Sequence, residues 1–264
     1  MDFEILLDIL ARDQTIIEPE KWNLTKSIVN KTLYNEQHEK IAIRLIACVP
    51  AWVLLNISVS LLVWLLGIQP KVTPKLFTFL HSFIVCRLTE YFAIQSHEML
   101  LSRIGKASPF TVADETIIYT TLSFSFVQTL VFVFWPSIKE LPGVCLNIIS
   151  FTSMVYCLQI NDVGCAEVVI IIWIIEFTNQ FLHLGGILKD MKMRKTKLAV
   201  LNKILYFGSY LVLRIGLFAY VLYGVMMRSD GSVEVVNIFK LMVSIVYSSG
   251  LFFIFKIIFV VIFC

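Results

Sequence analysis

Long apolar runs separated by short polar segments dominate this chain. Seven runs cover residues 42–67, 75–95, 111–135, 142–160, 164–188, 201–227 and 236–263. Each approaches or exceeds the roughly 20 apolar residues that a helix needs to cross a bilayer. The runs lack strict alternation and are longer than barrel strands, so they predict helices. We therefore expect an all-α integral membrane protein with about seven transmembrane helices.

The overall composition agrees with this pattern. Hydrophobic residues make up 58% of the chain and charged residues 16%, whereas soluble domains average about 45–50% and about 25%. The net charge of +3 is typical of basic loops beside a membrane and does not indicate nucleic-acid binding. The six cysteines and four histidines are scattered without metal-site spacing, so we expect no metal and no cofactor.

The charged segment 1–41 precedes the first run and lacks the long apolar core of a signal peptide. Its stretch "DFEILLDIL" has helical spacing of Ile and Leu and predicts a short amphipathic surface helix. Asn23 and Asn30 lie in glycosylation sequons. These sequons can carry glycans only if the segment is lumenal or extracellular.

Basic residues predict the orientation. The stretch "KDMKMRKTK" at 189–197 holds Lys189, Lys192, Arg194, Lys195 and Lys197. Short loops rich in Lys and Arg face the cytosol. With seven spans, the N-terminus would then be lumenal or extracellular and the C-terminus cytosolic.

Polar side chains interrupt the fifth apolar run. Because each helical residue advances by about 100°, Glu176, Asn179, Gln180 and His183 share one face, while Thr178 lies on the other side. Such groups are costly in hydrocarbon and usually face the protein interior. The stripe predicts either hydrogen bonds between helices or the polar wall of an intramembrane cavity.

Other runs offer polar partners for this stripe. The candidates are His81, Gln128, Asn147 and Arg214. We expect Arg214 to face Glu176 directly or through one water, because an unpaired buried charge costs several kcal/mol. Within the second run, Arg87 and Glu90 have the i,i+3 spacing of an ion pair.

The stretches "AEVVIIIWIIEFTNQFLHLGGILKDM" and "VLRIGLFAYVLY" resemble the signature half of the TLC domain, a multi-helix membrane domain that ceramide synthases share. "FTFLHS", with His81, is similar to the opening of that domain. The resemblance covers about residues 75–260. It implies a ring of six helices over 75–264 with the span at 42–67 outside it, residence in the endoplasmic reticulum, and sphingolipid-like or phospholipid-like partners.

Two departures from the TLC pattern bear on chemistry. Where most members have a His-His pair, this chain has Leu146-Asn147, and Gln128 occupies an acidic position. Amides form hydrogen bonds but cannot exchange protons at neutral pH, so we expect the acyl-transfer site to lack the residues that the reaction needs. We therefore favour non-catalytic lipid binding, sensing or lipid homeostasis. The alternatives are an acyltransferase with a rewired site that uses His81 or His183, a seven-helix receptor, and a transporter.

Overall fold

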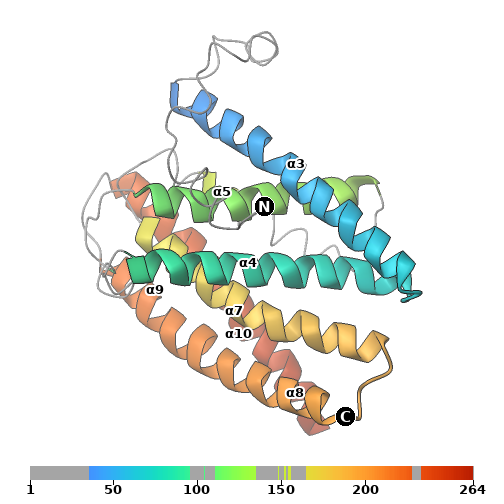
Figure 1. Ribbon diagram of the computed structural model, residues 1–264. Helices are drawn as coiled ribbons and strands as arrows, with labels where there is room; N and C mark the ends of the chain where they lie inside the picture. The colour runs from blue at the N-terminus through green and yellow to red at the C-terminus, as the bar shows by residue number, and fades with distance from the viewer. Residues whose placement is uncertain are drawn as a thin grey trace.

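The computed structural model describes residues 36–95, 104, 111–134, 148, 152, 154–155, 165–227 and 233–263, and every regular element in these residues is helical. The elements are α3 (Glu36–Leu65), the 3-10 turn η2 (Pro70–Val72), α4 (Thr73–Gln95), α5 (Val112–Phe134), α7 (Cys165–Asp190), α8 (Lys197–Ser209), the π-helical segment η5 (Tyr210–Leu217), α9 (Phe218–Met226) and α10 (Val233–Phe263) (Figure 1). The N-terminal sequons at Asn23 and Asn30, the "DFEILLDIL" stretch and most of the run at 142–160 lie outside the described residues.

The helix limits follow the apolar runs closely. The runs at 75–95, 111–135 and 164–188 become α4, α5 and α7 with shifts of two residues or fewer at each end. The run at 201–227 becomes one continuous rod of α8, η5 and α9 from Lys197 to Met226. Helix α3 begins earlier than predicted, at Glu36, and continues through Pro50.

Three helices within the described residues are long and apolar enough to cross a membrane: Ile43–Leu65, Ala166–Asp190 and Lys197–Met226. This is fewer than the seven spans expected from the sequence. Helix α4 carries Lys75, Arg87 and Glu90, and α5 begins with Asp114 and Glu115, which lowers the apolar character of both. Residues Asn237–Phe252 of α10 form a shorter apolar helix.

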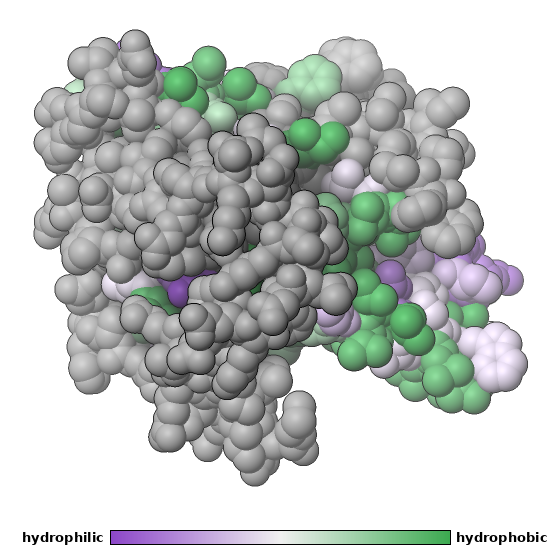
Figure 2. Space-filling model, turned by 90° about the horizontal axis from the view of Figure 1, so that it is seen from above, coloured by the Kyte–Doolittle hydropathy of each residue, from purple (hydrophilic) through white to green (hydrophobic). Residues whose placement is uncertain are grey.

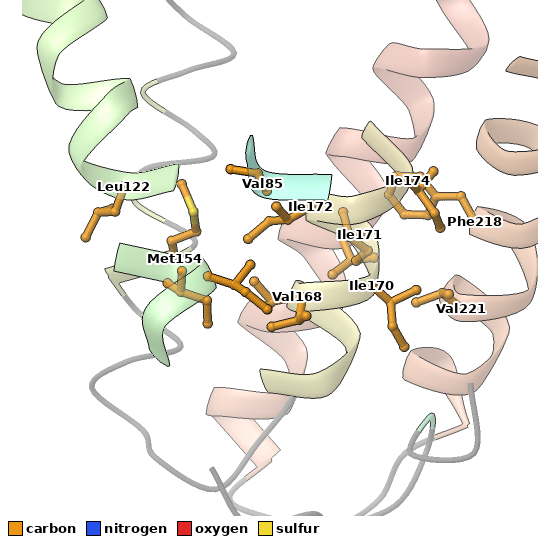
Figure 3. Packing of buried hydrophobic residues seen from close by; sticks show 14 of the residues in the cluster. Val85, Leu122, Met154, Val168, Ile170, Ile171, Ile172, Ile174, Phe218 and Val221 are labelled. Carbon is orange, nitrogen blue, oxygen red and sulfur yellow. The ribbon is translucent and has the colours of Figure 1, made fainter. Parts of the chain in front are cut away.

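Helix α7 forms the centre of the molecule and is the most buried of the three candidate spans. Its isoleucines pack toward both sides (Figure 3). Ile170 and Ile174 lie toward Val221 and Phe218 of α9, and Ile172 lies toward Val85 of α4. Helix α3 crosses the outside of α4 and α5 (Figure 1). The core is thus built around α7, and α3 is peripheral.

The rods run between two ends of the bundle. Arg44 pairs with Glu115, and eight residues further along each helix Trp52 bonds Ser123, so α3 and α5 are parallel. Helix α4 and the rod from α8 to α9 return in the opposite direction, whereas α7 and α10 run with α3 and α5 (Figure 1). The loops that follow α3 and α7 therefore lie at the same end.

Both loops at this end close with the same backbone motif. After α3, Gly67 N–H donates to Trp64 O and Ile68 N–H to Val63 O, both at 3.0 Å. Gly67 has φ of 63°, the left-handed conformation that glycine adopts without a Cβ clash. After α7, Lys192 takes the equivalent position with φ of 61°.

Hydrophilic residues gather at the right-hand edge of the molecule when it is seen from above (Figure 2).

Candidate functional site

The stripe on α7 meets α4 at a buried carboxylate. Glu176 is only 9% exposed. Ser82 Oγ donates to Glu176 Oε2 at 2.6 Å, and His81 Nδ1 lies 3.6 Å from the same oxygen. Asn179 Nδ2 approaches this oxygen at 3.5 Å. We call these four residues, His81, Ser82, Glu176 and Asn179, the Glu176 cluster.

His81 lies beneath an aromatic cover. Its ring stacks on Phe124 with 3.6 Å between centroids and 6° between planes, and its centroid is 5.2 Å from that of Trp52. Trp52 is fixed in turn because its Nε1–H donates to Ser123 Oγ at 3.0 Å. His81 is 1% exposed, and neither ring nitrogen has a hydrogen-bond partner within 3.5 Å. The imidazole is therefore shielded on the side away from Glu176.

Arg214 reaches α7 from the π-helical segment but does not touch Glu176. Its Nε donates to Thr178 Oγ1 at 2.7 Å, and its Nη2 donates to Asn179 Oδ1 at 2.8 Å and to Ile175 O at 3.2 Å. The direct contact with Glu176, one of the two arrangements predicted from the sequence, is absent, and Asn179 contacts both groups instead. The guanidinium approaches the side of α7 that holds Thr178. Helical spacing had placed this residue outside the stripe.

Two amides of the predicted site tie neighbouring helices together. Gln180 Nε2 donates to the backbone oxygen of Ser82 at 3.4 Å. Gln128 Nε2 donates to Thr78 Oγ1 at 3.2 Å, which joins α5 to α4. The Gln180 contact matches the interpretation of the stripe as hydrogen bonding between helices.

His183 is partly buried two turns along α7 from Glu176. Asn147 lies outside the described residues. Arg87 and Glu90 form a two-point ion pair, with Nη1–Oε2 at 2.9 Å and Nη2–Oε1 at 3.0 Å. This pair lies toward the other end of α4, apart from the Glu176 cluster.

Sequence reasoning missed two parts of this site. It did not predict that Thr178 binds Arg214, because the partner helix approaches from the side opposite the stripe. It also missed the cover formed by Trp52 and Phe124, which looked like ordinary apolar residues of separate spans. The available signal was the presence of Trp52 in one run and of many Ser and Thr residues in the run at 111–135, because a buried tryptophan N–H usually bonds a polar group.

The cluster can hold a single negative charge between α4 and α7 and can donate or accept hydrogen bonds. Within the described part of the chain, no group of three His, Cys, Asp or Glu side chains is arranged to hold a metal ion. A groove of about 520 Å³ lies nearby between α3 and α5, and its walls are mainly apolar. The lining residues are Val53, Asn56, Ile57, Ser60, Leu61, Val127, Leu130 and Val131. Val127 also packs in the aromatic cover, so this cover separates the groove from His81.

Comparison with known proteins does not assign the chain to a family. No protein family model matches the chain, and no curated protein sequence matches it.

Proposed function

We propose that this chain is a multi-pass membrane protein that binds a membrane lipid beside the Glu176 cluster without altering the lipid chemically. The carrying observation is the buried carboxylate, which contacts Ser82 and His81 and is linked through Asn179 to Arg214. Ionisable groups at membrane depth are costly and most often mark a functional interior. The resemblance to TLC domains supports a sphingolipid-like or phospholipid-like ligand.

The proposal includes seven crossings, with a TLC-type ring of six helices over 75–264 and α3 outside. Helices α5 and α7 run in the same direction (Figure 1). An alternating path therefore needs one further crossing between Phe134 and Cys165, and the apolar run at 142–160 is the candidate. The peripheral position of α3 also agrees with this arrangement. We further propose residence in the endoplasmic reticulum.

The lipid would contact two surfaces of the bundle, one on each side of the aromatic cover. Its acyl chain fits the apolar walls of the groove between α3 and α5. Its polar head would contact the partly exposed end of the stripe at Gln180 and His183, since Glu176 itself is enclosed. Both side chains can exchange hydrogen bonds with hydroxyl, amide or phosphate groups.

The binding test compares lipids that remain on the protein after gentle extraction. Wild-type protein should retain a defined lipid class, and a Glu176→Gln/His183→Leu variant should lose most of it, because the first change removes the negative charge of the stripe and the second removes its imidazole. Leu182→Ala is the matched control, since Leu182 is a 41% exposed residue on the same helix. Identical lipid profiles for all three proteins would refute the proposal.

One observation favours acyl transfer as a second candidate. A carboxylate can orient an imidazole for proton transfer, and His81 Nδ1 lies 3.6 Å from Glu176 Oε2. However, His81 is 1% exposed beneath Phe124, so a substrate has no path to it without movement of the cover. Acyl transfer from acyl-CoA by purified protein, abolished by His81→Ala, would establish this alternative.

A further inference from the structure

The turn between α7 and α8 carries a dense group of exposed cations. We call it the basic patch, and its members are Lys189, Lys192, Arg194, Lys195 and Lys197. All five side chains are exposed, within a stretch of nine residues, 189–197. They lie at the same end of the bundle as the loop after α3 (Figure 1). Repulsion among five close cations favours binding of an anionic partner.

The acidic residue of this stretch is already neutralised. Asp190 pairs with Lys75, and Lys71 Nζ lies 3.8 Å from its other oxygen. Among the residues that the structure describes, no ion pair involves a member of the basic patch. The five positive charges are therefore available to a ligand.

The backbone holds the cations on a fixed turn. Lys192 N–H donates to Lys189 O at 3.1 Å, and Met193 N–H donates to Leu188 O at 2.8 Å. Thr196 then caps α8, because its side chain accepts a hydrogen bond from Ala199 N–H.

Apolar residues surround the patch and fix its level in the membrane. Met191, Leu198 and Leu201 are 44%, 48% and 52% exposed. The two candidate spans end at Asp190 and begin at Lys197, so the patch lies where hydrocarbon gives way to headgroups. Lipid phosphates occupy that level.

We propose that the basic patch binds the phosphate of anionic phospholipids in the leaflet that this end faces. Clusters of four to eight basic residues directly beside a transmembrane helix are typical of such recognition. This surface differs from the Glu176 cluster, so the inference does not depend on the lipid proposed for that site.

The test titrates full-length protein in neutral detergent with dioctanoyl phosphatidylinositol 4-phosphate, phosphatidylserine, phosphatidylcholine and inorganic phosphate. We expect the two anionic lipids to bind more tightly than phosphatidylcholine or phosphate. Lys192→Gln/Arg194→Gln/Lys195→Gln should weaken binding by about tenfold or more. Lys192→Arg/Arg194→Lys/Lys195→Arg, which keeps every charge, should bind as wild type does.

Two further measurements separate the outcomes. Raising the salt concentration should weaken binding to the wild type, because exposed charges are screened, and this arm needs no variant. Glu176→Gln/His183→Leu alters the site proposed for the first lipid, so it should leave unchanged the preference of the basic patch for the two anionic lipids over phosphatidylcholine. Equal affinity for phosphatidylcholine, equal affinity for free phosphate, or full binding by the glutamine variant would each overturn the inference.

Discussion

Arg214 shows how one residue can place a charge among apolar helices without a carboxylate against it. Its guanidinium donates to a hydroxyl, an amide and a backbone carbonyl, all on α7. Its carbon Cζ also lies 5.3 Å from the centroid of the Tyr210 ring, in cation–π geometry. Neutral polar groups of α7 therefore take the place of the carboxylate partner that the sequence predicted for Arg214.

Replacement of Arg214 tests this arrangement. Hydrogen bonds between transmembrane helices average about 0.6 kcal/mol, so Arg214→Leu, which loses three, should destabilise the protein by about 2 kcal/mol. Thr178→Val alone should cost about 0.6 kcal/mol. Combining the two should cost little more than Arg214→Leu, because the bond between them is already lost. Thermal unfolding in detergent measures all three, and strictly additive losses would contradict the shared bond.

Lys192 offers a test of local backbone strain. A side chain in the left-handed region costs about 1–2 kcal/mol, and Lys192 has φ of 61° where the equivalent position after α3 is Gly67. Lys192→Gly should therefore stabilise the protein by up to about 1 kcal/mol, once the greater freedom of glycine in the unfolded chain is subtracted.

The control for this prediction is Lys192→Gln, which removes the same charge but keeps the strain. Its melting temperature should stay close to that of wild type. If both variants shift the melting temperature equally, repulsion among the cations rather than backbone conformation controls stability at this turn.

At the scale of elements, glycines set how closely α7 approaches its neighbours. A Cβ on Gly185 would lie 3.0 Å from Asn202 Nδ2, which donates to Phe181 O and joins α8 to α7. A Cβ on Gly186 would lie 3.0 Å from Cδ of Lys75, a flexible side chain that can move. No atom lies within 4 Å of the Cβ position of Gly208.

These surroundings predict a graded response to alanine. Gly185→Ala should destabilise by about 1 kcal/mol, because it displaces a buried hydrogen-bonded amide. Gly186→Ala should be nearly neutral, and Gly208→Ala should stabilise by up to about 1 kcal/mol through helix propensity. The apparent melting temperature should be lowest for Gly185→Ala, intermediate for Gly186→Ala and highest for Gly208→Ala. Equal effects at all three positions would contradict the contact geometry.

The elements also show how far sequence reasoning reaches. Limits of α4, α5 and α7 followed from apolar runs, because a span must match the bilayer and polar residues end it. The π-helical segment from Tyr210 to Leu217 could not be predicted from the sequence, since its apolar spacing resembles that of an α-helix. Helical spacing predicted one face of α7, but α4 and η5 contact different faces, which only tertiary packing reveals.

At the scale of the whole molecule, the direction of the rods constrains the path of the chain. Loops after α3 and α7 lie at one end, and the start of α5 lies at the other (Figure 1). Under the positive-inside rule, the basic patch predicts that the first end faces the cytosol. If α5 and α7 both cross the membrane, as proposed, their parallel course requires an odd number of crossings between Phe134 and Cys165.

Single-cysteine labelling tests this path in sealed microsomes, starting from protein whose six native cysteines are replaced by alanine. A membrane-impermeant maleimide added outside should label Gln69→Cys and Lys195→Cys, which lie at the end predicted to be cytosolic. It should label Val112→Cys only after the membrane is permeabilised. If the run at 142–160 crosses once, Lys139→Cys should behave like Lys195→Cys, and Asp162→Cys like Val112→Cys. Equal accessibility of positions 139 and 162 would exclude the seventh crossing, and with it the ring of six.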